Sequence, residues 1–190
     1  LTVSNSTFSH NRAISGNHNS GAYSGIAFSG AIHLGCMGVA SLEVRDCRFH
    51  HNQAIGGDGN VGGPLFDTGT ASGSATGGAI HSDSMPATIS GCTLDHNEAL
   101  GGAGAPGLPG GYGLGGGIDA TMPGAKITVT NCTVEYNLAL GGPGGPGANG
   151  AAGGGGLAHL DRRLDGVQVQ RVDDRLDALA DHRAGGLVHL

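Results

Sequence analysis

The residues whose types could do chemistry gather in two neighbouring columns of a repeated sequence block. One column holds Ser9, His50, Asp95 and Glu135, and the next holds His10, His51, His96 and Tyr136. If consecutive blocks stack, His51, His96 and the acids Asp95 and Glu135 come close together, and imidazole with carboxylate is a donor set that Zn²⁺ accepts. The alternative is an exposed corner that tolerates small polar residues and carries histidines stacked by repeat duplication. Because this alternative needs no ligand, we expect no metal and no cofactor.

Cleavage of a polysaccharide would make different demands on the acidic residues. Hydrolysis needs two carboxyl groups that flank the scissile bond at a defined separation. The acids of residues 1–156 are scattered, and the obvious neighbours are Asp95 and Glu135. A lyase would need a basic group beside an acidic calcium site, and the cations of this region are Arg12, Arg45, Arg48 and Lys126. We therefore expect no catalytic residues in this chain and no enzymatic activity from it alone.

These columns belong to a fourteen-residue block that occurs four times. The block begins at residues 1, 42, 87 and 127, so its copies start 41, 45 and 40 residues apart. The copies read LTVSNSTFSHNRAI, LEVRDCRFHHNQAI, ATISGCTLDHNEAL and ITVTNCTVEYNLAL. A repeat of this period is typical of a solenoid, in which each unit packs against its neighbours along one axis.

Each block predicts two short strands joined by a corner. Its first and third positions are apolar around a polar second position, and the sixth and eighth positions repeat this alternation. A period of two with β-branched residues is the pattern of a strand that buries one face. The fifth position holds Asn5, Asp46, Gly91 and Asn131. These residue types tolerate the left-handed backbone of a tight corner.

Two columns of the block predict structural ladders. The eleventh position is always asparagine, at Asn11, Asn52, Asn97 and Asn137. A side-chain amide stacked on an identical one can bond both its neighbour and its own turn. The sixth position places Cys47, Cys92 and Cys132 in one inward column. Parallel side chains in one column suit the near-perpendicular torsion of a disulfide poorly, so we expect three buried thiols.

A third strand per repeat is predicted outside the block. It is indicated by the tripeptides Gly30-Ala31-Ile32, Gly78-Ala79-Ile80 and Gly116-Gly117-Ile118. Three short strands per turn, linked by corners and repeated in register, predict an all-β chain folded as a parallel β-helix. The block count gives about four coils, separated by long glycine-rich loops.

The alternation of Gly-Gly-Ala-Ile-like and Phe-x-x-Asn motifs resembles the repeats of polymorphic outer-membrane proteins and related bacterial right-handed β-helix repeat proteins. Phe8-Ser-His-Asn11 and Phe49-His-His-Asn52 match fully, whereas Leu94-Asp-His-Asn97 and Val134-Glu-Tyr-Asn137 lack the aromatic residue. The resemblance covers roughly residues 1–156 and implies the right-handed β-helix of the pectin-lyase-like superfold. It also implies a secreted or cell-surface location, with a carbohydrate or a host or cell-surface protein as partner. The superfold includes polysaccharide lyases and hydrolases, but a shared superfold does not confer an activity.

The glycine-rich loops carry a period of their own. Glycine recurs every third residue from 101 to 116 and again from 141 to 153. This is the spacing of extended polyproline-II strands packed side by side. We therefore hypothesise that successive loops lie against one another. A flexible linker is the alternative, and the composition also supports it.

Composition and charge exclude several classes of protein. With 40 glycines among 190 residues and no tryptophan, the chain cannot build a core of large side chains, although a solenoid needs few apolar residues per coil. A net charge of −6 without a basic patch argues against nucleic acid as a partner. No apolar run approaches the ~20 residues of a membrane span. Leu1 falls on the first position of a block, so we expect further repeats of the same array, and any export signal, to precede it.

The character of the sequence changes at residue 157, where aspartate and arginine replace the earlier serine, threonine and asparagine. Three interpretations of residues 157–190 compete: a degenerate fifth coil, a helical cap and out-of-frame sequence. A fifth coil is due at Val167-Gln168-Val169, which falls 40 residues after Ile127-Thr128-Val129. A cap is indicated because Leu157, Leu160, Leu164 and Val167 share one helical face. We favour a short helical cap after a repeat domain of residues 1–156.

The expected function is that of a non-catalytic repeat protein, either a structural stalk or a surface for adhesion and carbohydrate binding. The alternative is part of a polysaccharide lyase or glycoside hydrolase whose catalytic coils lie mostly outside this chain. A third hypothesis is ice binding through the outward threonine columns, which Glu43 and Arg48 interrupt.

Overall fold

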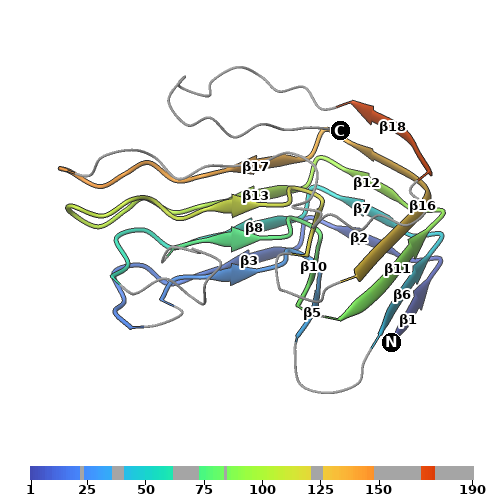
Figure 1. The fold of residues 1–190 in the computed structure, drawn as a ribbon, viewed down its shortest axis with the longest axis horizontal. Helices are drawn as coiled ribbons and strands as arrows, with labels where there is room; N and C mark the ends of the chain where they lie inside the picture. Colours follow the sequence, from blue (N-terminus) through green and yellow to red (C-terminus); the bar gives the residue numbers. More distant parts are fainter. Residues whose placement is uncertain are drawn as a thin grey trace.

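The computed structural model describes residues 1–21, 24–35, 41–61, 73–83, 85–120, 126–147 and 168–173, and every regular element in them is a β-strand (Figure 1). The first repeat contains β1 (Thr2–Ser4), β2 (Thr7–Ser9), β3 (Arg12–Ile14), β4 (Ala27–Phe28) and β5 (Ile32–Leu34). The second contains β6 (Leu42–Arg45), β7 (Arg48–His50), β8 (Gln53–Ile55), β9 (Ala75–Thr76) and β10 (Ile80–Ser82). The third contains β11 (Pro86–Ser90), β12 (Thr93–Asp95), β13 (Glu98–Leu100), β14 (Gly113–Leu114) and β15 (Ile118–Asp119). The fourth contains β16 (Lys126–Glu135) and β17 (Leu138–Leu140), and β18 (Gln168–Asp173) follows.

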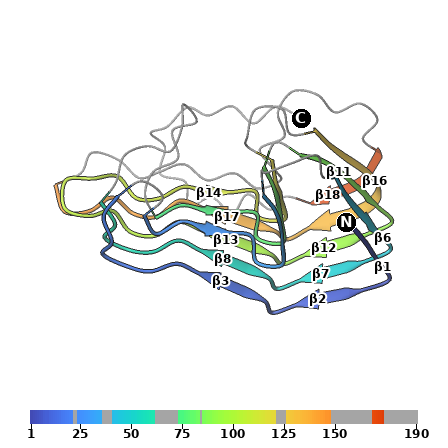
Figure 2. The ribbon, with the colours of Figure 1, turned by 90° about the horizontal axis from the view of Figure 1, so that it is seen from below.

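Equivalent strands of successive repeats pair in parallel and build four sheets. Sheet I has the order β1-β6-β11-β16-β12-β7-β2, with β18 also paired to β16. Sheet II is β3-β8-β13-β17, sheet III is β4-β9-β14 and sheet IV is β5-β10-β15. Residues at the same position of successive blocks lie opposite each other: Val3 pairs with Val44, and Ile89 with Val129, in sheet I. The repeats therefore lie in layers, one above the next, as Figure 2 shows for β2, β7 and β12.

Mostly parallel strands in several sheets are compatible with the predicted β-helix-like fold, but each complete repeat contains five short strands where we expected three. One extra strand in each repeat is β4, β9 or β14, which ends at a left-handed corner at Ser29, Gly77 or Gly115. The other arises from a second corner within the block, at its tenth position. His10, His51, His96 and Tyr136 all have left-handed backbones there, with φ between 54° and 57°. The predicted corner at the fifth position is also left-handed, with φ of 49° at Asn5 and 51° at Asp46.

The strands enclose two apolar cores of different character. Sheets I and IV contribute large side chains to the first core, and Phe49, Leu94 and Ile80 are fully buried in it. Sheets II and III contribute only alanines to the second core, which contains Ala27, Ala54, Ala75, Ala99 and Ala139. A methyl group is the largest side chain that such closely packed sheets accept, and this explains how a chain so rich in glycine and alanine buries a core.

The eleventh-position asparagines form a continuous hydrogen-bonded column. The Nδ2 groups of Asn11, Asn52 and Asn97 donate to the Oδ1 atoms of Asn52, Asn97 and Asn137 over 2.8, 2.9 and 2.8 Å. Asn52 and Asn97 are fully buried. Each Oδ1 also accepts the backbone N–H of the preceding ladder asparagine. The side chains therefore supply acceptors for backbone N–H groups that the corner would otherwise leave without a hydrogen bond.

The column of cysteines is buried and contains no disulfide. Cys47, Cys92 and Cys132 are free thiols, and Cys36 lies outside the described residues. The backbone N–H groups of Cys47 and Cys92 point at the sulfur of the next cysteine over 3.4 and 3.3 Å. Burial raises the pKa of the Cys47 thiol, which disfavours the reactive thiolate.

The glycine-rich loops are hydrogen-bonded to one another, and those after β13 and β17 extend side by side in Figure 1. The N–H of Gly102 donates to the carbonyl of Gly73 over 2.8 Å, that of Gly111 to Gly102 over 2.9 Å, and that of Gly142 to Gly111 over 2.8 Å. The prediction that successive loops lie against one another is confirmed for these described residues. The polyproline-II conformation stays a prediction. The loop after β13 also differs from the expectation in one respect, because it turns back at Gly107, where φ is +78°.

We expect Gly102→Ala to destabilise the fold by roughly 1–3 kcal/mol, the usual cost of overpacking. A Cβ at Gly102 would lie 2.2 Å from the carbonyl oxygen of Gly57, and neither backbone can move without breaking the bonds between the loops. Gly16→Ala is the matched control, since its Cβ would meet only the movable end of the Asn19 side chain. Urea unfolding followed by circular dichroism measures both variants, and equal stabilities would contradict close packing of the loops.

The segment after residue 157 is described only at β18. Residues 168–173 form a strand parallel to β16. They are therefore not part of the helical cap that we favoured. The open edge of β16 offers unpaired backbone groups, and pairing with it satisfies them. Gln168 lies opposite Thr130, whereas the 40-residue spacing predicted Thr128. The other residues of the proposed cap, 157–167 and 174–190, lie outside the described residues.

Candidate functional site

The tenth-position side chains form an exposed column of stacked rings at the corner where the strands of sheet I end and those of sheet II follow. The ring centroids of His10 and His51, of His51 and His96, and of His96 and Tyr136 are each 5.0 Å apart. The rings of His51 and His96 lie within 4° of parallel. We call this column, made of His10, His51, His96 and Tyr136, the ring ladder. Because each ring covers the face of the next, the ladder presents ring edges to solvent.

The predicted neighbours of the ring ladder are in place, but they do not form a compact donor set. Asp95 lies opposite Glu135 in the register of sheet I, as the spacing predicted. The carboxylate of Asp95 accepts hydrogen bonds from Arg48 over 3.4 Å and contacts Nδ1 of His96 over 3.2 Å. Among the described residues, the three-residue group whose ligand atoms converge lies elsewhere.

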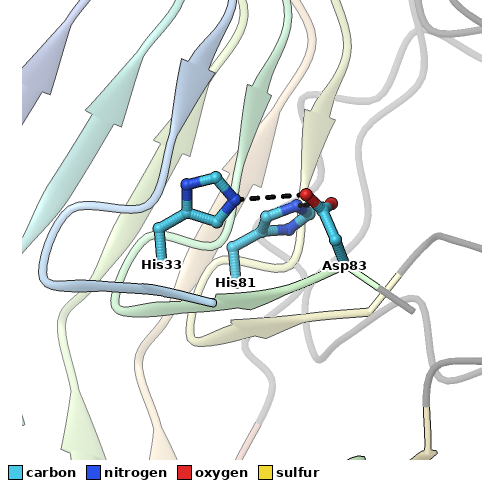
Figure 3. Close-up of side chains that lie close together, drawn as sticks. All are labelled: His33, His81 and Asp83. Carbon is cyan, nitrogen blue, oxygen red and sulfur yellow. Dashed lines mark hydrogen bonds and ion pairs between the residues drawn. The ribbon is translucent and has the colours of Figure 1, made fainter. Parts of the chain in front are cut away.

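That group consists of His33, His81 and Asp83 and belongs to a row of four ionisable side chains along sheet IV, three of which Figure 3 shows. Nδ1 of His81 lies 2.8 Å from Oδ2 of Asp119, and Nε2 of the same ring lies 2.7 Å from Oδ1 of Asp83. The second oxygen of Asp83 lies 3.3 Å from Nε2 of His33. We call His33, His81, Asp83 and Asp119 the imidazole–carboxylate chain.

The sequence of sheet IV explains how these side chains meet. His33, His81 and Asp119 each follow the isoleucine of the Gly-Ala-Ile motif, and the strand register places His33 and Asp119 on either side of His81. Asp83 comes directly after β10, and the hydroxyl of the preceding Ser82 donates to the Met85 carbonyl over 2.9 Å.

Burial increases steadily from His33 to Asp119 along the imidazole–carboxylate chain. The Asp119 and His81 side chains are 0% and 1% exposed, whereas Asp83 is 12% and His33 is 36% exposed. The ring of Phe28 stacks on His33 with centroids 5.1 Å apart and also contacts His81 at 5.5 Å. The imidazole–carboxylate chain therefore runs from the buried Asp119 to the protein surface at His33.

The two carboxylates control the protonation of His81. Burial by itself lowers the pKa of His81, but the hydrogen bonds to Asp119 and Asp83 outweigh burial and raise this pKa from 6.5 to about 9. Burial likewise raises the pKa of the Asp83 carboxyl, but the hydrogen bonds to His33 and His81 hold it well below its ordinary value of 3.8. At neutral pH His81 is therefore an imidazolium, hydrogen-bonded to Asp83 on one side and to Asp119 on the other.

We expect the stability of the metal-free protein to depend on pH through this arrangement. Because the pKa of His81 is raised on folding, its contribution is complete below pH 6.5 and is lost as the pH rises through about 9. Its size is on the order of 3 kcal/mol at one pKa unit per 1.36 kcal/mol. Because the pKa of Asp83 is lowered, its contribution is complete above pH 3.8 and is lost as the pH falls below that value. Urea unfolding at pH 6 and pH 9.5 checks this, with His81→Gln as the reference that should lose the His81 contribution at both values.

The imidazole–carboxylate chain was not predicted from the sequence. His33 and His81 were not singled out, and Asp83 and Asp119 were counted only among the scattered acids. The position after the isoleucine of each Gly-Ala-Ile motif, which reads His, His and Asp, carried the information. Reading that column with the same stacking rule would have placed three ionisable side chains in one line.

Comparison with known proteins found no family model, no curated protein and no solved structure that matches this chain. Within the described residues, no helix is long and apolar enough to cross a membrane.

Proposed function

We propose that this chain is a stretch of right-handed parallel β-helix from a secreted or cell-surface protein, and that it binds carbohydrate through the ring ladder without cleaving it. The stacking of equivalent positions in four parallel sheets supports the β-helix. The observation that carries the binding role is the ladder itself, a line of exposed imidazole edges repeated every 5.0 Å.

The backbone at the ring ladder supports a role for its side chains. A left-handed conformation costs a residue other than glycine about 1–2 kcal/mol, and the ladder places four such residues in it. Glycine would adopt this corner without that cost, so the rings are maintained at some expense to stability. Strained positions of this kind cluster at functional sites.

The chemistry of the ladder favours a polyhydroxylated ligand. The ring faces are covered, so recognition depends on the nitrogen atoms at the ring edges, which can both donate and accept hydrogen bonds. Arg48, Asp95 and His50 flank the ladder and add donors and acceptors of both kinds. A glycan whose hydroxyl groups repeat along its length matches such a row better than an apolar partner does.

A glycan array tests the proposal with His51→Ala/His96→Ala as the comparison. The wild type should retain a subset of glycans without releasing products, and the double variant should lose at least tenfold in affinity. Ile14→Ser is a matched control, because Ile14 is 61% exposed on sheet II, away from the ladder. Equal binding by the double variant would exclude the ladder, and capture of a cell-surface protein but no glycan would change the class of partner.

Glycan cleavage is the second candidate function, and the register favours it at one point. Asp95 and Glu135 are direct partners on adjacent strands, as two carboxyl groups of a retaining hydrolase would be at about 5–5.5 Å. Release of new reducing ends from a bound glycan, abolished by Glu135→Gln, would support this function and displace the non-catalytic one.

A further inference from the structure

We propose that His33, His81 and Asp83 bind a divalent transition-metal ion such as Zn²⁺, with Asp119 acting as the positioning residue behind His81. This inference concerns sheet IV and is independent of carbohydrate binding at the ring ladder.

The first argument is the convergence of three donor atoms on one point. Nε2 of His33, Nε2 of His81 and a carboxylate oxygen of Asp83 all lie within 4.8 Å of one another. In a tetrahedral zinc site with bonds of 2.0–2.2 Å, neighbouring ligand atoms are about 3.4 Å apart. The three donors therefore need to move by roughly 1 Å to enclose an ion, and Figure 3 shows both rings pointing at the carboxylate.

The second argument is the hydrogen bond behind His81. A histidine that binds a metal generally donates its other ring N–H to a carboxylate, which fixes the tautomer and the ring orientation. Nδ1 of His81 lies 2.8 Å from Oδ2 of the fully buried Asp119. If Nδ1 carries the proton, the lone pair of Nε2 faces Asp83, which is the direction in which the ion would lie.

The third argument is charge. Nε2 of His81 and Oδ1 of Asp83 are only 2.7 Å apart, so a positive charge, either the ring proton or a bound ion in its place, lies beside both atoms. Two carboxylates and one divalent ion balance, so an ion can replace the proton that holds this contact in the metal-free protein.

The donor set also indicates the kind of ion and its accessibility. Two imidazoles and one carboxylate suit Zn²⁺ and other first-row ions better than Ca²⁺ or Mg²⁺, which prefer oxygen ligands alone. Three protein donors leave a fourth position for water or another ligand, as in zinc sites that are not purely structural. His33, with a side chain 36% exposed, provides the entrance.

The ring ladder is a less suitable metal site despite its four rings. The ladder rings stack face to face, and Nδ1 of His51 and Nδ1 of His96 contact different residues, His50 and Asp95, so the ring nitrogens do not converge on one point. It therefore supplies the matched control for the experiment, because His51→Ala removes an exposed imidazole of equal chemistry.

The experiment is titration of the chelator-stripped, untagged chain with Zn²⁺ by calorimetry, repeated with Co²⁺ to follow the visible absorption of a four-coordinate site. We expect His33→Ala to weaken binding at the highest-affinity site at least 100-fold. Asp119→Asn should weaken it about 10–100-fold, the usual cost of removing a partner behind a ligand. His51→Ala should bind as the wild type does.

The Co²⁺ spectrum separates positioning from mere stability. Asp119→Asn should retain the four-coordinate absorption at saturating Co²⁺, whereas Asp83→Asn should change it. Thermal melting in chelator shows which variants are folded, and His33→Ala, altered at the surface, remains informative if the others are not. Wild-type binding no tighter than that of His33→Ala, or binding lost only in His51→Ala, would overturn the proposal.

Discussion

Asn97→Ala is expected to lower the free energy of unfolding by about 4 kcal/mol or more. Oδ1 of Asn97 accepts the backbone N–H and Nδ2 of Asn52 over 3.0 and 2.9 Å, and its Nδ2 donates to Asn137 over 2.8 Å and to the Phe49 carbonyl over 3.0 Å. Alanine removes all four bonds at a fully buried position. Each buried polar group left without a partner costs about 1–3 kcal/mol.

Asn11→Ala is the matched control for the asparagine column. Asn11 is exposed, and its side chain donates one ladder bond, to Oδ1 of Asn52 over 2.8 Å. Its loss should cost about 1 kcal/mol, the net value of one hydrogen bond. Urea unfolding of the two variants gives the comparison. Equal losses at Asn11 and Asn97 would mean that the column does not hold the repeats together.

The second large effect is expected at His81. His81→Leu leaves the buried Asp83 and Asp119 carboxylates facing an apolar side chain, and removal of one partner from a buried ionic group typically costs about 3–5 kcal/mol. The measurement is urea unfolding at pH 6 in the presence of chelator, so that metal binding does not contribute.

Two further variants separate charge from packing at this site. His33→Ala should cost less than 1 kcal/mol in chelator because His33 is half-exposed and its bond to Asp83 is 3.3 Å long. Asp119→Asn should recover part of the stability lost in His81→Leu, because it removes one of the two buried charges. A double variant no more stable than His81→Leu would show that the loss comes from packing alone.

The fold was predictable where one residue type recurs at one block position. The asparagines, the inward cysteines and the apolar alternation all repeat at intervals of 40 to 45 residues, and stacking is the one arrangement that pairs them. The division of each repeat into five strands was not predictable in the same way. His10, His51, His96 and Tyr136 adopt φ values near 55°. Histidine is enriched at positive φ but is a weaker signal of a tight corner than glycine, asparagine or aspartate, and tyrosine is no such signal.

The two candidate sites differ in how many of their residues could be predicted from the sequence. The ring ladder lies inside the block, so its rings and the pair Asp95 and Glu135 could be aligned from spacing alone. In the imidazole–carboxylate chain, His33, His81 and Asp119 also share a column, but Asp83 does not. Asp83 lies two residues after His81 on the same face of the extended backbone, because its N–H continues the pairing of β10 with β5 by donating to the Leu34 carbonyl over 3.0 Å. This relation follows the two-residue period of a strand and not the period of the repeated block.

The in-register stacking of the repeats is tested most directly by nuclear Overhauser effects between the side-chain amide protons of the four asparagines. The structure predicts contacts from Asn11 to Asn52, from Asn52 to Asn97 and from Asn97 to Asn137, with slow exchange at the two buried central positions. Amide protons that exchange at the rate of an unfolded chain and show no contact across 40 or more residues would contradict the fold and both sites built on it.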